Sequence, residues 1–338
     1  MADGTKDTEK NQKEFERCRS IIENCRIEAA KRIIGQTHVI DGILTALIAG
    51  GHILLEGVPG LAKTLAVKTF ADMSGLSFKR IQFTPDLLPA DVTGTLIYEQ
   101  GAGRFSVRKG PVFTNLLLAD EINRSPAKVQ SALLEAMGEY QVTIGEQSFE
   151  LPKPFFVMAT QNPIDQEGTY NLPEAELDRF LLKILLNYPS GEEEQRIVKS
   201  GGRLEEVPVA RVFDADSIEL CRSLLDDVTV TDDIVRYIVS IVNVTRPDKD
   251  KKNTGSASGS AVLKYLSFGA SPRASIALNR CAKVRALFAG RSFVLPEDVK
   301  AAAPDVLRHR LILSYEAAAD NVSADDLIEK ILSLMPVP

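Results

Sequence analysis

Residues 52–69 read HILLEGVPGLAKTLAVKT, and this stretch decides how the rest of the chain is interpreted. The apolar run 53–55 is typical of a buried parallel strand. The segment 57–62 contains two glycines and a proline, which break regular structure, and a helix is predicted from Lys63 onward. A strand, a glycine-rich turn, Lys-Thr and a helix in this order predict a phosphate-binding loop.

The physical basis of this prediction is the start of the helix. The first N–H groups of a helix have no partner within it and carry the positive end of the helix dipole, and glycines let the backbone aim further N–H groups at one anion. Lys63 would place a cation on the β- and γ-phosphates of a nucleotide, and the Thr64 hydroxyl would hold Mg²⁺. The residues expected to bind the nucleotide are Gly57, Val58, Pro59, Gly60, Leu61, Ala62, Lys63, Thr64 and Leu65.

Ala62 stands where the usual pattern, G-x-x-x-x-G-K-[ST], has glycine. Alanine adds one methyl group, so the loop can still form if residue 62 has a helical φ. An ordinary strand-to-helix turn followed by an unrelated Lys-Thr is the alternative interpretation of this stretch taken alone.

A pair of carboxylates supports the nucleotide interpretation. Asp120 and Glu121 directly follow the apolar run 116–119, which is predicted to be a second buried strand. Two adjacent carboxylates in this position are costly unless they meet a cation or a proton. In a nucleotide hydrolase Asp120 would bind Mg²⁺ through water and Glu121 would polarise the attacking water. A solvated strand end is the alternative.

Composition limits the other classes of function. The chain has 338 residues, which favours two domains, and a formal net charge of −6 without a long Lys/Arg run, so nucleic acid is not the default partner. The four cysteines, Cys18, Cys25, Cys221 and Cys281, lack C-x-x-C spacing; we expect reduced thiols in a cytoplasmic protein rather than a zinc site. No signal peptide and no run of membrane-spanning length is found, so no membrane insertion is expected.

Three regions are expected along the chain. Residues 1–33 form a polar tail and an amphipathic helix, and residues 34–188 alternate strands and helices, which predicts an α/β domain with a parallel sheet and a site at the carboxyl ends of its strands. Two β-hairpins, around 95–107 and 141–151, interrupt this alternation as insertions. A helix is expected to start with Ser125 as its cap and Pro126 in its first turn.

Residues 189–338 show helical patterns only, and we expect an all-helical second domain. Within it, residues 246–261 read RPDKDKKNTGSASGSA, which is charged and then rich in Gly and Ser. This composition favours a mobile surface loop that is dispensable for the chemistry.

Five segments, in this order, resemble the MoxR family of AAA+ ATPases: GVPGLAKT at 57–64, DEINR at 120–124, TQNP at 160–163, LPEAELDRF at 172–180 and GASPRA at 269–274. The resemblance covers about 34–309 and implies a P-loop NTPase core with two inserted hairpins, followed by a helical lid. Ala62 is common in that family, whereas the loop 246–261 is longer and more polar than its usual lid.

The resemblance also implies roles for individual residues. Lys63 and Thr64 correspond to the Walker A pair, and Asp120 and Glu121 to the Walker B pair. Asn162 resembles the sensor-1 residue, Arg273 the sensor-2 arginine, and Arg179 the arginine finger that reaches the ATP of a neighbouring subunit. Arg124 is a second candidate for that role. Asn162 as a loop cap and Arg273 as a surface residue are the structural alternatives.

The expected function is therefore Mg²⁺-dependent ATP hydrolysis by a homo-oligomer, with a hexameric ring as the expected form. The family implies remodelling of a protein client, with a von Willebrand A-type partner or in metal-cofactor insertion. Two alternatives stay open at this point: a motor subunit of the magnesium-chelatase type, and a scaffold that binds ATP in order to assemble but turns over little.

Overall fold

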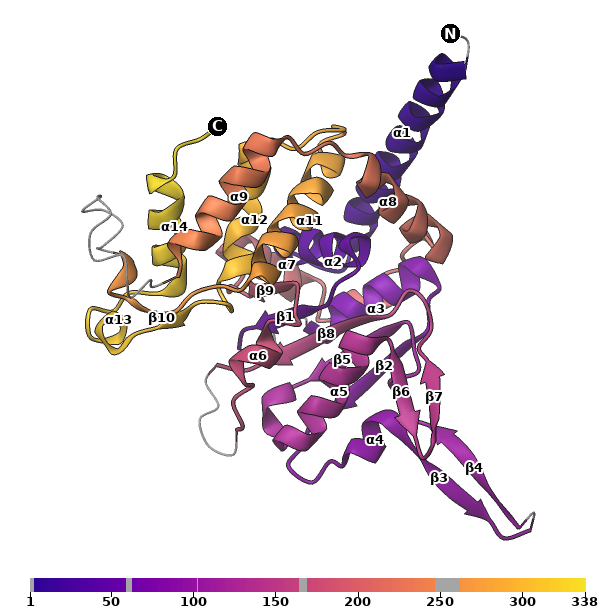
Figure 1. The fold of residues 1–338 in the computed structure, drawn as a ribbon. Helices are drawn as coiled ribbons and strands as arrows, with labels where there is room; N and C mark the ends of the chain where they lie inside the picture. The colour runs from indigo at the N-terminus through magenta and orange to yellow at the C-terminus, as the bar shows by residue number, and fades with distance from the viewer. Residues whose placement is uncertain (1–2, 59–62, 102, 164–168, 247–261) are drawn as a thin grey trace. The chain divides into compact units, whose positions relative to one another are not determined.

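The computed structural model describes residues 3–58, 63–101, 103–163, 169–246 and 262–338 (Figure 1). Its contacts define two compact units. We call residues 20–180 and 184–220 the core unit, and residues 1–19, 181–183 and 221–338 the lid unit. The contacts thus group residues 189–220 with the core unit, whereas the sequence pattern places them in the second domain.

A five-stranded sheet organises the core unit. Its order is β2-β5-β8-β1-β9, and β2 with β5, β5 with β8 and β8 with β1 pair in parallel, which confirms the expected α/β class. The central strands are almost fully buried, as their apolar sequences require. The strands are β1 (Ile53–Glu56), β2 (Phe78–Gln82), β5 (Leu116–Asp120), β8 (Phe156–Gln161) and β9 (Leu182–Leu185).

Helices precede, connect and follow these strands. The elements up to the start of the second unit are α1 (Asp3–Ala29), α2 (Thr37–Ala49), α3 (Lys63–Ser74), α4 (Pro89–Thr93), η1 (Ile122–Arg124), α5 (Ala127–Glu139), α6 (Glu174–Leu177), α7 (Gly191–Lys199), η2 (Leu204–Glu206) and α8 (Ala215–Asp227). The expected cap of α5 is wrong: Pro126 occupies the N-cap position, and the Ser125 hydroxyl donates to the Ile122 carbonyl, because a 3-10 turn precedes the helix.

One apolar cluster fixes the sheet to the elements beside it. It joins Leu117 and Val157 of the sheet to Leu133 of α5 and Val142 of the second hairpin, all buried. Figure 1 shows α5 and both hairpins grouped near the β2 edge of the sheet. Burying side chains of this size contributes about 1.5–3 kcal/mol each, so this cluster holds the second hairpin against the sheet and α5.

His52 links three parts of the core unit. Its ring is buried, and Nδ1 accepts a hydrogen bond from the Val157 N–H at 3.1 Å. The proton therefore lies on Nε2, which donates to the Met137 carbonyl at 3.2 Å. This histidine ties the start of β1 to β8 and to α5.

Both expected hairpins are present: β3 (Gly94–Glu99) with β4 (Arg104–Lys109), and β6 (Gln141–Ile144) with β7 (Gln147–Glu150). Glycine is required where the first hairpin begins. Gly94 has φ 106°, and a Cβ there would lie 2.3 Å from the Arg108 carbonyl oxygen. The hairpins also meet, since a Cβ on Gly145 would lie 2.7 Å from Leu96 Cδ1.

The lid unit is helical, with one addition to the expected pattern. Its further helices are α9 (Asp232–Val244), α11 (Pro272–Phe288), α12 (Pro296–Leu307), α13 (Tyr315–Ala319) and α14 (Ala324–Leu334). The addition is a two-stranded antiparallel ladder of β10 (Leu266–Phe268) and β11 (Ile312–Leu313), which the expectation of helices alone missed. Apart from Arg246, the segment 246–261 that we expected to be a mobile loop lies outside the described residues.

The cysteines require a correction. Cys18 and Cys221 form a disulfide with a Cα–Cα distance of 5.7 Å, so the expectation of four reduced thiols is wrong for this pair. The two cysteines are 203 residues apart in the sequence, so cysteine spacing could not indicate that they pair. Cys25 and Cys281 are free and buried, and burial raises the pKa of each thiol to about 12.

Within the described ranges, no helix is both long and apolar enough to cross a membrane.

Candidate active site

The two described ends of the phosphate-binding loop meet at the carboxyl edge of the sheet. The Gly57 N–H donates to the Gln161 carbonyl at 3.3 Å, and Lys63, the first residue of α3, donates from Nζ to the Gly57 carbonyl at 2.5 Å. Glycine is needed at position 57, because a Cβ there would lie 2.6 Å from Leu186 Cβ. Thr64 and Leu65 follow on α3 and are half-buried; Pro59, Gly60, Leu61 and Ala62 lie outside the described residues.

Asp120 ends β5 and is held by two neighbouring strands. Thr160 of β8 donates from Oγ1 to Asp120 Oδ1 at 2.6 Å. Arg80 of β2 donates to Oδ2 from Nη2 at 2.6 Å and from Nε at 3.2 Å. The carboxylate is thus fixed in position, with its side chain 14% exposed. A carboxylate has about four lone-pair sites, so these three bonds leave room for one more donor, such as a water.

Glu121 sits on a strained backbone. Its φ is 55°, in the left-handed region that non-glycine residues rarely adopt. Its N–H donates to Thr160 Oγ1 at 2.8 Å, so one threonine holds both residues of the acidic pair. Such strain costs about 1–3 kcal/mol and is kept where the surroundings enforce it, often at a functional site.

The Glu121 side chain has two partners. Gln82 donates from Nε2 to Oε2 at 2.8 Å, and Arg124 Nε lies 3.2 Å from the same oxygen. Glu121 is therefore aimed by a residue of β2 and by one of the 3-10 turn that follows it.

Sequence reasoning missed three residues of this cluster: Arg80, Gln82 and Thr160. Arg80 and Gln82 are two polar residues on one face of β2, a weak signal in an otherwise half-buried strand. Their partners could be named only from the strand order, which places β2 beside β5. Thr160 was noted only as part of the TQNP segment.

The remaining candidate residues differ in position. Asn162 is buried directly after β8, whose Gln161 pairs with Glu56 of β1, so it lies at the same edge of the sheet as Asp120. Arg124 contacts Glu121, as described above. Arg273 lies in the first turn of α11, in the lid unit.

Arg179 has a different environment from Arg124. It is exposed beyond α6 and makes no ion pair within the described part of the chain. A Cβ on Gly138 of α5 would lie 2.0 Å from Arg179 Nη1, so the guanidinium rests against that glycine. The structure therefore gives Arg179 no local ion-pairing role.

The donor set fits a magnesium nucleotide. A lysine ammonium and a helix N-terminus suit phosphate, and a hydroxyl with a carboxylate suits Mg²⁺, which prefers oxygen ligands and keeps several waters. In the ranges that the structure describes, no group of three or more His, Cys, Asp and Glu residues could hold a metal ion.

Comparisons with known proteins give the same picture. Residues 52–182 match the ATPase family associated with various cellular activities (AAA), and residues 260–331 match the AAA lid domain. Chaperone MoxR1 of Mycobacterium tuberculosis is 46% identical over 318 residues, 94% of this chain and 82% of that protein. Protein MoxR of Methylorubrum extorquens is 31% identical over 92% of this chain and 93% of its own. A crystal structure from Cytophaga hutchinsonii has a TM-score of 0.88 and 45% identity and covers 99% of both chains.

The fold, the acidic pair after β5 and the lysine at the start of α3 define an AAA+ ATPase of the P-loop class. More particularly, the chain belongs to the MoxR family, as the relatives that match nearly its whole length show.

Proposed function

We propose that this protein hydrolyses ATP with Mg²⁺ and uses the energy to remodel a protein client. The observation that carries the proposal is the acidic pair at the end of β5, held by one threonine beside the lysine-bearing end of the phosphate loop. A cluster with this much positioning and a strained backbone has no evident purpose as a surface strand end.

The chain's own groups divide the work. Lys63 exchanges its bond to the Gly57 carbonyl for the β- and γ-phosphates, which offer full negative charge instead of a carbonyl dipole. Thr64 and Asp120 would hold Mg²⁺, with Asp120 acting through water. The ion neutralises charge on the phosphate oxygens when bound.

Glu121 orients and deprotonates the attacking water. Gln82 and Arg124 hold the Glu121 side chain in one position, so it loses little conformational freedom when the water is bound for reaction. Asn162, buried at the same edge, would help to position this water, and Arg273 is assigned the contact with the γ-phosphate that the resemblance implies.

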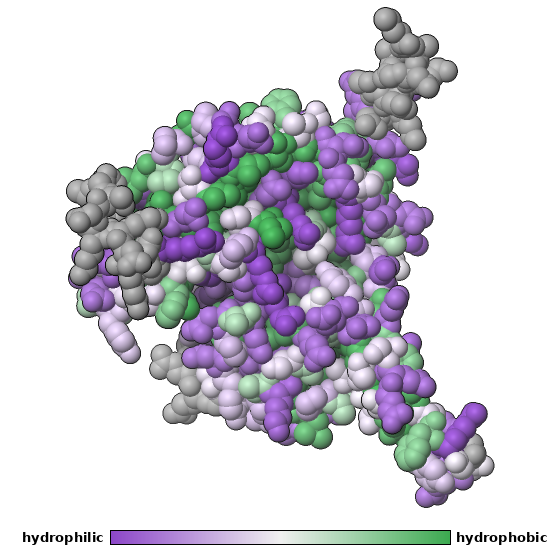
Figure 2. Space-filling model, in the orientation of Figure 1, coloured by the Kyte–Doolittle hydropathy of each residue, from purple (hydrophilic) through white to green (hydrophobic). Residues whose placement is uncertain are grey.

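The proposed assembly is a homo-oligomeric ring, most simply a hexamer, in a cytoplasmic protein. Arg179 supplies the arginine finger to its neighbour. The first hairpin offers a surface for a client, since Tyr98 and Phe105 are 52% and 67% exposed and their rings form a tilted pair with centroids 5.2 Å apart. Figure 2 shows apolar and polar residues mixed at this projecting end. Metal-cofactor insertion with a von Willebrand A-type partner is one form such remodelling takes.

Lys63→Ala tests the site. We expect loss of ATP binding and turnover with an unchanged thermal unfolding curve, because the lysine's evident task is to bind phosphate. Lys128→Ala, an exposed lysine on α5, is the matched control and should behave like the parent. Normal ATPase activity in Lys63→Ala would show that the site is assigned wrongly.

A further inference from the structure

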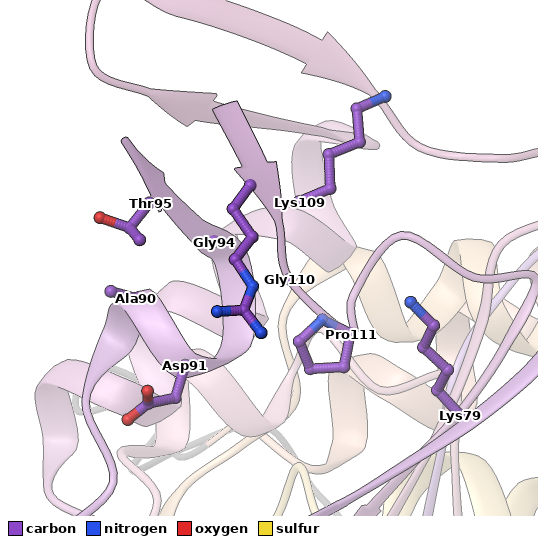
Figure 3. A pocket seen from close by; sticks show the side chains of 9 residues that line it. Lys79, Ala90, Asp91, Gly94, Thr95, Lys109, Gly110 and Pro111 are labelled. Atoms are coloured by element: carbon purple, nitrogen blue, oxygen red, sulfur yellow. The ribbon is translucent and has the colours of Figure 1, made fainter. Parts of the chain in front are cut away.

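A basic pocket lies at the base of the first hairpin, away from the active site. It has a volume of about 390 Å³ and is lined by Lys79, Ala90, Asp91, Gly94, Thr95, Arg108, Lys109, Gly110 and Pro111. Figure 3 shows Lys79 and Lys109 on one side of it and Asp91 and Thr95 on the other. The lining carries three cations and one carboxylate, so the pocket is positively charged although the net charge of the chain is −6.

Two of the three cations have no ion-pair or hydrogen-bond partner for their side chains among the described residues. Lys109 Nζ lies over the rings of Phe113 and Phe149, at 4.8 and 5.3 Å from their centroids. Lys79 and Arg108, by contrast, make no ion pair or hydrogen bond through their side chains with any described residue. Asp91, the carboxylate of the lining, accepts from the Leu88 N–H at 2.8 Å and caps α4. The pocket therefore offers unused positive charge.

The strand that carries Lys79 has a free edge. β2 is the last strand of the sheet, and the Leu116 N–H donates to the Ser77 carbonyl while the Phe83 N–H donates to the Asp120 carbonyl. Ladder bonds alternate along a strand, so residues 77, 79, 81 and 83 face β5 and residues 78, 80 and 82 point their backbone groups outward. In the described part of the chain no other backbone group pairs with those three residues.

We propose that the β2 edge and this pocket together bind an extended acidic segment of a partner polypeptide. The segment would add a strand beside β2 by backbone hydrogen bonds and place carboxylates on Lys79 and Arg108. Charged residues on an edge strand normally discourage pairing with other chains. Here the positive charges of Lys79 and Arg108 instead determine which segment can pair with β2, because they repel a basic segment and attract an acidic one. This binding uses the backbone edge of β2 and the cations of the pocket, none of which is assigned to nucleotide, and so it goes beyond the function proposed above.

The test uses the full-length protein without nucleotide and a fluorescent peptide of alternating Glu and Val. We expect saturable binding by anisotropy, weakened at least tenfold in Lys79→Glu and in Arg108→Glu. Arg104→Glu is the matched control: it lies on the same hairpin outside the pocket, and it should bind the peptide like the parent. A Lys-Val peptide should show the reverse preference and bind the Lys79→Glu/Arg108→Glu double variant better than the parent.

Peptide chemistry keeps the test independent of whether a variant folds. With the parent protein, a Gln-Val peptide should lose affinity because it lacks charge, and a Glu-Val peptide N-methylated at alternate residues should lose at least tenfold because it cannot form the ladder. If the N-methylated peptide binds as tightly as the unmethylated Glu-Val peptide, the segment does not add a strand to β2. If pyrophosphate displaces the Glu-Val peptide at equal concentration, the pocket is a site for small anions instead. Unchanged binding in both pocket variants would overturn the site itself. ATPase activity, measured separately, should be the same in all these variants.

Discussion

At the scale of single residues, Glu121 is the side chain that we propose as the base for the attacking water. Gln82 donates a hydrogen bond to its carboxylate and Arg124 forms an ion pair with it, and the amide oxygen of a glutamine in its place can still accept from both donors. Glu121→Gln should therefore keep ATP affinity but lower turnover by at least about 10²-fold, because glutamine cannot accept the water's proton. Nucleotide binding and single-turnover hydrolysis measured on the same preparation separate the two effects.

Glu135→Gln is the control for this substitution, since Glu135 is exposed on α5 and should change neither quantity. Hydrolysis at the parent rate in Glu121→Gln would remove Glu121 from the mechanism.

The cysteines give a second prediction at this scale. Burial raises the pKa of Cys25 and Cys281 to about 12, so almost no thiolate is present at pH 8 and neither should react with an alkylating reagent in the native protein. After denaturation without reductant, mass spectrometry should find these two thiols labelled, and reduction should add Cys18 and Cys221. Labelling of all four without reduction would contradict the disulfide.

The limits of sequence reasoning are clear in the acidic cluster. Asp120 and Glu121 could be predicted, because an apolar strand ending in carboxylates is visible in one stretch of chain. Arg80 and Gln82 could not be assigned, because their contacts exist only through the order of strands in the sheet. Lateral contacts between strands distant in sequence leave no local pattern.

At the scale of elements, too, a feature could be predicted only where it leaves a local pattern in the sequence. The helix α5, the helical character of the second domain and both hairpins could be predicted because their signals span many residues. β10 and β11 are three and two residues long, too short to show a strand pattern among helices. The cap of α5 was misassigned because Ser125 is used by the preceding 3-10 turn.

Arg308 joins elements of the lid unit, and its removal should be costly. Its guanidinium bonds to Asp305 at 2.8 Å and to Asp325 of α14 at 2.9 Å, and its side chain is 10% exposed. Burial alone would lower the pKa of Arg308, but the hydrogen bonds that it donates to Asp325 and Asp305 outweigh burial, and the pKa is raised. Arg308→Met removes the cation from its ion pair with the buried Asp305, so we expect a loss of about 3–5 kcal/mol in unfolding free energy.

Arg236→Met is the matched control for urea unfolding. Arg236 also pairs with an aspartate three residues away, Asp233, but the two side chains are 72% and 65% exposed. Such a pair contributes about 0–1 kcal/mol. Equal losses in the two variants would show that burial of the Arg308 cluster has no energetic consequence.

The start of α14 predicts a dependence on acid. Asp326 accepts hydrogen bonds from the Ser323 hydroxyl and N–H, and these lower its pKa from 3.8. A lowered pKa means that the stabilisation is fully present above pH 3.8 and is lost as the pH falls through the lower folded-state pKa. Asp326→Asn should be less stable than the parent at pH 7, and the difference should shrink below about pH 4. A difference that is constant with pH would rule out the charge as its cause.

At the scale of the whole molecule, the question is whether Arg124 or Arg179 acts on the active site of a neighbouring chain. Arg124 is committed to Glu121 of its own chain at 3.2 Å, whereas Arg179 makes no ion pair in the described part of its own chain. An exposed arginine without a local partner is free to reach a neighbour, so Arg179 is the better candidate for the trans-acting residue. An arginine finger contributes about 10³–10⁵ in turnover, far more than an ordinary surface contact.

Mixing variants tests this directly. Arg179→Ala should bind ATP nearly as the parent does and hydrolyse it poorly, and Glu121→Gln should do the same for a different reason. In a mixed ring, an Arg179→Ala chain contributes an intact Glu121 and its Glu121→Gln neighbour contributes an intact Arg179, so some interfaces are complete and activity should recover. Arg124→Ala mixed with Glu121→Gln should show no recovery, because Arg124 acts on the glutamate of its own chain. Recovery with Arg124→Ala but not with Arg179→Ala would exchange the two roles. If neither mixture recovers while sedimentation shows mixed oligomers, the active site is complete within one chain and assembly serves some purpose other than catalysis.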